Sequence, residues 1–278
     1  MNTPSLFGRG FIGNWYMETY PAVEVHRQDI YSPTPEILYM RSTVHNYHPK
    51  DGDPFEDIRT NLVHFMEVLE ENRKLHKEMV FNLVSTWFVY GQTKLPAAED
   101  SPCNPTGFYS ITALAREQLL KSYAETIGFK YRILRLGNVI GVGDKKASLK
   151  KNALQHFCRE LAQGREVSIY KKGSIRDYID VRDCVSAIHL VLEKGKLNET
   201  YNIANGLGLN TKDLIYTAWE HSGYLSKINE IDVPDFHKSV QTPIMWMSAK
   251  KIRELGYIQQ YDIEQTVRSL VDHYMREK

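Results

Sequence analysis

Cysteine is scarce in this 278-residue chain, which contains three and has no Cys-x-x-Cys pair. Cys103, Cys158 and Cys184 are scattered, and no group of cysteines and histidines has the spacing of a zinc site. The sequence therefore predicts no metal site. Scattered cysteines in an odd number also favour a reducing, cytoplasmic setting over a disulfide framework.

An excess of charge of one sign is also missing, because 35 basic and 34 acidic side chains give a formal net charge of +1. A main partner such as nucleic acid or an anionic membrane usually requires a strongly basic face or stretch. No apolar run reaches about 18 residues, and the first residues have neither the basic nor the apolar part of a signal peptide. We therefore expect no nucleic-acid partner and no membrane partner.

The order of the predicted elements indicates an α/β fold. Helical spacing of apolar residues alternates with short apolar runs, which predicts a Rossmann-type doubly wound parallel sheet with helices on both faces. The expected strands are 4–8, 36–40, 79–84 and 131–136, with a weaker candidate at 22–27, and the expected helices are 11–19, 54–74 and 109–127. We predict a dinucleotide-binding domain over 1–138 and about 177–205, and a smaller mixed substrate lobe over 139–176 and 206–278.

A glycine-rich turn, Gly8-Arg9-Gly10-Phe11-Ile12-Gly13, joins the first predicted strand to the first predicted helix. In such a turn the first glycine permits a tight bend, and the second lets the backbone approach a pyrophosphate. The third lets the helix pack closely on the strand. Free N–H groups at the start of the helix then favour an anion. The turn predicts a bound dinucleotide, contacted by Gly8, Gly10, Phe11, Ile12 and Gly13.

Several ordered segments further along the chain match a single family. They are residues 84–91, 108–119, 134–141, 173–183, 201–206 and 248–257. With the glycine turn, they resemble the extended short-chain dehydrogenase/reductase family, and within it the nucleotide-sugar epimerases and dehydratases, the type that includes UDP-galactose 4-epimerase. The resemblance covers nearly the whole chain. It implies an enzyme that uses NAD or NADP on a nucleotide-diphosphate sugar, and commonly a homodimer through the helices at 54–74 and 109–127.

The resemblance also implies the catalytic residues. In this family a tyrosine phenolate moves a proton on a sugar hydroxyl while hydride passes to or from nicotinamide, and a serine or threonine hydroxyl shares the hydrogen bond. Tyr109 matches the tyrosine and also a cofactor contact, Thr86 matches the hydroxyl residue, and Ser85 is its near alternative. A free tyrosine has a pKa of about 10, which is too high for a base near neutral pH. The family lowers this pKa with a lysine one helical turn later.

Ala113 occupies the position of that lysine, which is the largest departure from the family's pattern. Without the ammonium, the pKa of Tyr109 should stay high and the nicotinamide ribose should lose a hydrogen-bond donor. Arg116 lies two helical turns from Tyr109 and is expected to be a poor substitute. We therefore expect an NAD(P)-dependent nucleotide-sugar epimerase or 4-ketoreductase with impaired turnover. The alternative is a catalytically silent relative that binds a dinucleotide as a sensor or scaffold.

The stretch after the glycine turn is shorter than in the family, which predicts that one strand–helix unit is missing. If 23–30 forms the second strand, Arg27 sits where the 2′-phosphate of NADP would lie. If it replaces the third strand, Asp29 and Ile30 resemble the family's pair beside the adenine, and the order of the elements favours this second interpretation. Arg41 stands where the family has a small residue, so it either pairs with a cofactor phosphate or obstructs the pocket.

The substrate side of the site shows a further departure. Trp87 and Phe88 stand where the dehydratases carry Asp and Glu, so the acid needed to expel water is absent and 4,6-dehydration is not expected. Epimerization and 4-keto reduction both remain open.

Four residues are expected to contact the substrate. By resemblance, Asn138 and Arg176 hold the nucleotide diphosphate, and Asn152 lies at the helix that enters the substrate lobe. For Arg176 the alternative is a salt bridge with a neighbouring aspartate. His45 follows the strand at 36–40 on its carboxyl side, where open α/β sheets bind ligands, and is expected to line the sugar pocket.

Overall fold

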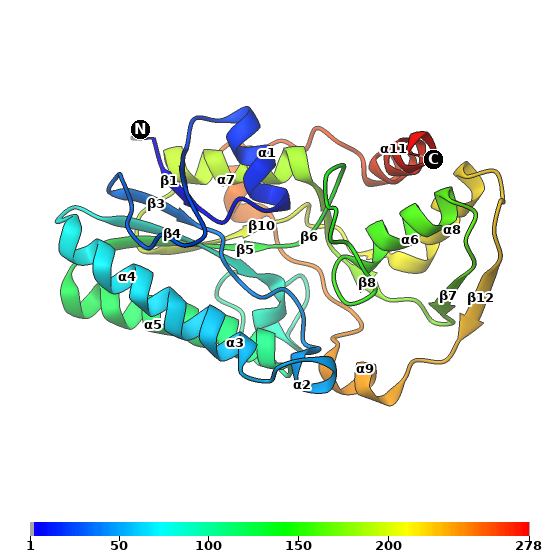
Figure 1. Ribbon diagram of the computed structural model, residues 1–278, viewed down its shortest axis with the longest axis horizontal. Helices are drawn as coiled ribbons and strands as arrows, with labels where there is room; N and C mark the ends of the chain where they lie inside the picture. Colours follow the sequence, from blue (N-terminus) through cyan, green and yellow to red (C-terminus); the bar gives the residue numbers. More distant parts are fainter. Residues whose placement is uncertain (1–2, 278) are drawn as a thin grey trace.

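The computed structural model describes residues 3–277, and its centre is a parallel sheet (Figure 1). Within these residues the sheet has six strands in the order β10-β5-β4-β3-β1-β2, and every pairing is parallel. The strands are β1 (Ser5–Phe7), β2 (Val23–Val25), β3 (Glu36–Tyr39), β4 (Val80–Thr86), β5 (Lys130–Leu136) and β10 (Glu199–Ile203). The predicted Rossmann-type α/β fold is confirmed.

Helices cover both faces of the sheet, and the alternation of side chains along each strand decides which face is which. Leu38 of β3 packs in a cluster with residues of α1 (Phe11–Thr19) and α7 (Val181–Lys194). Its neighbours Ile37 and Tyr39 pack on the other face, against α4 (His64–Leu75) and α5 (Phe108–Ile127). Figure 1 shows these two helix pairs on opposite sides of the strands. Helix α5 ends at Gly128, whose φ of 96° is the left-handed conformation that glycine adopts readily.

The helix expected over 54–74 is divided. It consists of α3 (Glu56–Ile58), a π-helical turn (Arg59–Val63) and α4. π-helical turns occur frequently at functional sites, because the extra residue re-aims the side chains around it. Here the turn carries Asn61, which is completely buried.

The strand β2 pairs directly with β1, with Ser5 opposite Val23. This is the position of the second strand, so the interpretation of 23–30 as a replacement for the third strand is wrong. Residues 26–35 contain neither helix nor strand, and the chain passes straight into β3. The predicted loss of one strand–helix unit is therefore visible as a short loop at the edge of the sheet.

A second group of elements lies beside the carboxyl ends of the sheet strands (Figure 1). Three helices share one buried apolar cluster: α6 (Ala153–Ala162), α8 (Thr211–His221) and α11 (Ile263–Arg276). Short strand pairs surround them: β7 (Val167–Tyr170) with β12 (Ile228–Ile231), β6 (Asn138–Ile140) with β9 (Tyr178–Asp180), and β8 (Ile175–Arg176) with β11 (Leu209–Asn210). The short helices are α2 (His48–Asp51), α9 (Asp235–Val240) and α10 (Lys250–Glu254). The predicted domain boundaries stay a prediction.

Candidate active site

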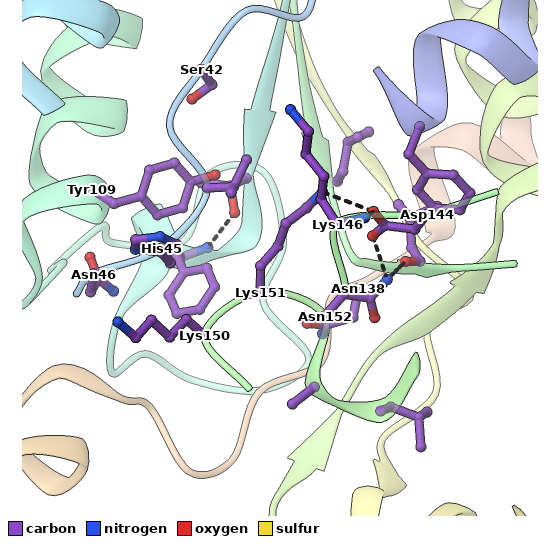
Figure 2. Close-up of a pocket in the computed structure, with 18 of the residues that line it drawn as sticks. Ser42, His45, Asn46, Tyr109, Asn138, Asp144, Lys146, Lys150, Lys151 and Asn152 are labelled. Atoms are coloured by element: carbon purple, nitrogen blue, oxygen red, sulfur yellow. Dashed lines mark hydrogen bonds and ion pairs between the residues drawn. The ribbon is translucent and has the colours of Figure 1, made fainter. Parts of the chain in front are cut away.

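A cleft of about 1630 Å³ runs from the glycine turn across the carboxyl ends of the sheet strands to the second group of elements. Figure 2 shows part of it: Ser42, His45 and Tyr109 lie on one side, and Asn138, Asp144 and Asn152 lie on the other. Loops after the strands of a parallel sheet are the usual place for a ligand. The cleft therefore brings most of the candidate residues into one space.

Local geometry requires glycine at two of the three glycine positions of the turn, Gly8 and Gly13. Gly8 has a φ of 110°. A Cβ on Gly13 would lie 2.4 Å from the carbonyl oxygen of Gly8, so only glycine allows α1 to sit so close to β1. A Cβ on Gly10 would meet nothing within 4 Å, and no side chain caps the start of α1. The first N–H groups of α1 therefore face open space, as an incoming pyrophosphate requires.

Tyr109 lies in the first turn of α5 and is 8% exposed. Burial raises the pKa of its phenol, and hydrogen bonds with the hydroxyls of Thr86 and Ser42 act in the opposite direction. Thr86 is the last residue of β4, and its Oγ1 also accepts a hydrogen bond from the backbone N–H of Phe88 at 3.3 Å. The Phe88 ring meets the Tyr109 ring edge to face, with ring centres 5.9 Å apart. The phenol thus has a fixed place at the floor of the cleft.

Ser85 is engaged elsewhere, although it is the neighbour of Thr86. Its hydroxyl donates to the carboxylate of Glu117 at 2.5 Å, and that carboxylate forms a buried ion pair with Arg135 at 2.7 Å. Thr86 rather than Ser85 therefore interacts with Tyr109.

Ser42 was not identified from the sequence, and its position depends on a buried network. Its hydroxyl donates to Oδ1 of Asn61 at 3.1 Å, and the amide of Asn61 donates to Thr112 of α5 at 2.9 Å. The same amide donates to Thr43 at 2.7 Å. The π-helical turn that carries Asn61 thus connects the end of β3 to α5. A sequence pattern gives little signal for such a network, because its members are far apart along the chain.

Ala113 lies one helical turn after Tyr109 and is completely buried. It packs in an apolar cluster that includes Trp87, Tyr90 and Met247. The position therefore supplies neither a cation nor a donor to the cleft.

Arg41 holds the short loop that follows β2. Its guanidinium donates to the backbone carbonyls of Val25 at 3.1 Å, His26 at 2.6 Å and Asp29 at 2.8 Å, and it lies 4.9 Å from the centre of the Phe7 ring. Arg41 therefore stabilises the loop at the edge of the sheet. A contact with a cofactor phosphate stays a prediction.

Three other predicted cofactor residues follow β2. Arg27 lines the cleft, whereas Asp29 and Ile30 do not. Ile30 instead borders a separate shallow depression against α4. Because β2 is the second strand, this arrangement favours the interpretation that places Arg27 near the 2′-phosphate of NADP over the one that places Asp29 and Ile30 beside the adenine.

Arg176 is 8% exposed and lies 5.0 Å from the Trp87 ring, to which it presents its guanidinium. Burial lowers the pKa of Arg176 to about 10, so it remains a cation at neutral pH. The nearby aspartates have other partners: Asp180 pairs with Arg182 at 2.7 Å, and Asp177 accepts backbone N–H groups. The alternative of a salt bridge to a neighbouring aspartate is therefore wrong.

Asn138 and Asn152 are held by the backbone around them. The Asn138 amide donates to the carbonyl of Asp177 at 2.9 Å and accepts from the Trp87 indole at 3.3 Å. Asn152 precedes α6 with a φ of 54°, and its amide donates to Asp144 at 3.2 Å (Figure 2). Both side chains line the cleft.

His45 also lines the cleft, and its ring lies 4.3 Å from that of His48. Burial lowers the pKa of His45, with a further lowering from His48. The imidazole is therefore neutral near pH 7 and can both donate and accept hydrogen bonds. Figure 2 shows Lys150, from the loop before α6, on the same side of the cleft.

Among residues 3–277, no group of three or more His, Cys, Asp or Glu residues is placed to hold a metal ion. No helix in this part of the chain is both long enough and apolar enough to cross a bilayer. The three cysteines are free thiols.

More than half of the chain matches a known protein family. The model of the NAD dependent epimerase/dehydratase family matches residues 30–204, which begin after the glycine turn. GDP-6-deoxy-D-mannose reductase of Pseudomonas aeruginosa is 28% identical over 59% of this chain and 55% of its own length. dTDP-glucose 4,6-dehydratase of Streptomyces griseus is 26% identical over 80% of this chain and 66% of its own length. The matched region thus spans less than two thirds of either relative.

Solved structures resemble the whole chain. UDP-glucose 4-epimerase of Thermus thermophilus, complexed with NAD, has a TM-score of 0.83 at 21% identity and covers 99% of both chains. RMD from Pseudomonas aeruginosa, complexed with NADPH, has a TM-score of 0.85 at 20% identity, covering 99% of this chain and 100% of its own. At these identities the likeness concerns the fold, and it agrees with the family resemblance predicted from the motifs.

Proposed function

Because this chain belongs to the NAD dependent epimerase/dehydratase family, we propose that it is a nucleotide-sugar epimerase or 4-ketoreductase that uses NAD or NADP. The observation that carries the proposal is the placement of Tyr109, with its Thr86 partner, in the same cleft as the glycine turn. The turn would hold the pyrophosphate through the uncapped start of α1, and Phe11 and Ile12 lie directly beside it. The bound nicotinamide would supply or accept a hydride.

The electrostatics of the cleft support two anionic ligands. Lysines and arginines far outnumber the two carboxylates among its lining residues, Glu24 and Asp144, although the chain as a whole is nearly neutral. Glu24 is paired with Arg9 at 2.6 Å and Asp144 with Lys151 at 3.0 Å. A dinucleotide and a nucleotide diphosphate each bring phosphates that such a cleft favours. Asn138, Asn152 and Arg176 would face the diphosphate, and His45 the sugar.

Tyr109 would act as the acid and base. Its phenolate takes the proton of a sugar hydroxyl as a ketone forms, and the phenol returns a proton when the ketone is reduced. The Thr86 hydroxyl holds the same oxygen in place. Trp87 and Phe88 stack with ring centres 3.8 Å apart, so an aromatic surface stands beside the base where a dehydratase would need an acid. This favours epimerization or ketone reduction over dehydration.

Ala113 would make turnover slower than in relatives that have lysine there. The ribose loses a donor, so the cofactor should be held less tightly. If turnover is lost completely, the chain is a silent dinucleotide-binding relative that acts as a sensor or scaffold. Ala113 is the observation that favours this second candidate.

The test is to denature the purified protein and identify what it releases by absorbance and mass. Released NAD(H) or NADP(H), together with turnover of a UDP-, GDP- or dTDP-linked sugar that Tyr109→Phe abolishes, would support the enzyme. A dinucleotide without turnover of any such sugar would favour the silent relative. Absence of both a dinucleotide and sugar binding would contradict both candidates.

We also propose a homodimer through α4 and α5. Phe108, Ile111 and Leu119 are exposed on α5 and recur at helical spacing on one face. A second copy of this helix pair is the occupant that such a face fits, and Val63 at the start of α4 is exposed as well.

A further inference from the structure

Arg116 is a buried cation without a carboxylate partner. It is 1% exposed, and no ion pair joins it to an acidic group among residues 3–277. The adjacent Glu117 is committed to Arg135 on the other side of α5. Two nitrogens of the guanidinium donate to backbone carbonyls, and Nε is buried with no hydrogen-bond partner. A buried charge of this kind is unfavourable unless something compensates for it.

The carbonyl partners of Arg116 place its guanidinium beside the candidate base. They belong to Arg41, at 2.9 Å, and Val84, at 3.1 Å. Arg41 immediately precedes Ser42, and Val84 lies two residues before Thr86. Ser42 and Thr86 are the two hydroxyls that hydrogen-bond Tyr109. The guanidinium and the phenol are thus anchored to the same two strand ends, and both line the cleft.

The helix explains how Arg116 reaches this place. Residues three apart are neighbours on a helix surface, and a long side chain covers the turn before its own Cα. The Arg116 side chain therefore extends back along α5 to the strand ends, where its guanidinium meets the carbonyls of Arg41 and Val84. The expectation that Arg116 is a poor substitute considered only the separation of the backbone positions along α5.

We propose that Arg116 is a positioning residue that replaces the charge of the missing lysine and stabilises the phenolate of Tyr109. Two charged groups act on Tyr109: Arg116 has the larger effect and lowers the pKa of the phenol against the effect of burial, whereas the buried Asp57 raises it. The proposal rests on the proposed function of Tyr109 as the base. Arg116 replaces the charge and not the ribose contact, because its side chain is only 1% exposed and its guanidinium is turned towards the carbonyls of Arg41 and Val84.

The experiment measures ionisation of Tyr109 directly. The ultraviolet absorbance of phenolate is titrated in the full chain and in Tyr109→Phe, and their difference isolates Tyr109. The same pair is measured with Arg116→Gln, Arg116→Lys and Ala113→Lys/Arg116→Gln. We expect Arg116→Gln to raise the apparent pKa of Tyr109 by at least about one unit, Arg116→Lys to keep it, and the double variant to restore it. Arg132→Gln is the control, because Arg132 is also buried but pairs with Glu36 at 3.2 Å, away from the cleft.

A purely structural role for Arg116 gives a different result. In that case Arg116→Gln lowers Tm but leaves the titration of Tyr109 unchanged, which would overturn the proposal. If Arg116→Gln does not fold, Arg116→Met carries the test, because an unbranched apolar side chain removes the charge and suits a buried position. A raised pKa of Tyr109 in Arg116→Met supports the proposal, and an unchanged pKa overturns it.

Turnover gives a second measurement. The acid limb of the pH profile of kcat/KM should move to higher pH in Arg116→Gln, so that activity falls at least about tenfold near pH 7 and recovers in alkaline buffer. A structural role predicts the same fractional loss at every pH. The two proposals can fail independently. If neither the parent chain nor any variant turns over any sugar, the proposed function is contradicted, whereas the titration of Tyr109 can still support the role of Arg116.

Discussion

The hydroxyl of Thr86, at the end of β4, interacts with the phenol of Tyr109, in the first turn of α5, while the adjacent hydroxyl of Ser85 donates to Glu117. Two neighbouring hydroxyls on one strand therefore point to opposite surroundings, one to the cleft and one to a buried ion pair. This follows from the alternation of side chains along a strand.

The different roles of the Thr86 and Ser85 hydroxyls can be measured. Thr86→Val should lower kcat by at least about tenfold with little change in Tm, because it removes a hydrogen bond at the reacting oxygen. Ser85→Ala should mainly lower stability, by about 1 to 3 kcal/mol, because it leaves the buried Glu117 carboxylate short of a donor. Kinetics and thermal unfolding of both variants check this. A larger loss of kcat in Ser85→Ala would reverse the assignment.

Restoring the lysine should improve both cofactor retention and turnover. Ala113→Lys returns a donor for the ribose, so a larger fraction of the purified protein should contain dinucleotide and kcat should rise. Ala113→Met is the matched control, since it adds similar bulk to this buried position without charge. Equal behaviour of the two variants, or no gain in either quantity with lysine, would show that position 113 does not limit the reaction.

Arg27 and Arg41 should affect the cofactor in different ways. Arg27→Ala should weaken NADP(H) more than NAD(H), because only NADP carries a 2′-phosphate. Arg41→Ala should weaken both and lower Tm, because it releases the carbonyls of the loop after β2. Titration of each variant with both dinucleotides distinguishes these outcomes. Unchanged affinities in Arg27→Ala would identify that residue as a solvated surface charge.

Alkaline pH should destabilise the fold through buried tyrosines. Burial raises the pKa of Tyr39 and of Tyr178 to about 12, while an unfolded tyrosine has a pKa of about 10. The folded state therefore holds these protons more tightly, so stability is complete below about pH 10 and falls as the pH rises towards 12. Each group should contribute about 2 to 3 kcal/mol.

Tyr39→Phe provides the control for this pH dependence. The Tyr39 hydroxyl is buried without a hydrogen-bond partner, so its removal costs no hydrogen bond. Urea unfolding between pH 8 and pH 12 should show a shallower loss of stability in this variant, at a neutral-pH stability no lower than that of the parent. Identical pH profiles for the two proteins would exclude Tyr39 as a contributor.

The oligomeric state tests the exposed face of α5. Ile111→Glu should shift a dimer towards monomer in sedimentation velocity, because it places a charge in an apolar interface. Lys121→Glu, which also changes charge on the same helix, is the comparison. A parent chain that sediments as a monomer would contradict the proposed dimer.

The sequence was sufficient for the parts of this molecule that depend on local spacing. The glycine turn, the alternation of strands and helices, and the pairing of Thr86 with Tyr109 all follow from residues close in sequence or from ordered motifs. The register of β2 against β1 depends on contacts across the sheet, and the interpretation favoured from element order was wrong for that reason. Ser42 was missed as a partner of Tyr109, and Arg116 was expected to be a poor substitute for the lysine, because the positions of both side chains depend on contacts across elements.

Arg41 contributes both to the loop after β2 and to the support of Arg116. Its side chain binds the carbonyls of the loop after β2, and its own carbonyl accepts a hydrogen bond from Arg116. The edge of the sheet and the floor of the cleft are therefore parts of one cooperative unit. Local opening of the loop would release the Arg41 side chain and so weaken the support of the buried Arg116 guanidinium beside Tyr109.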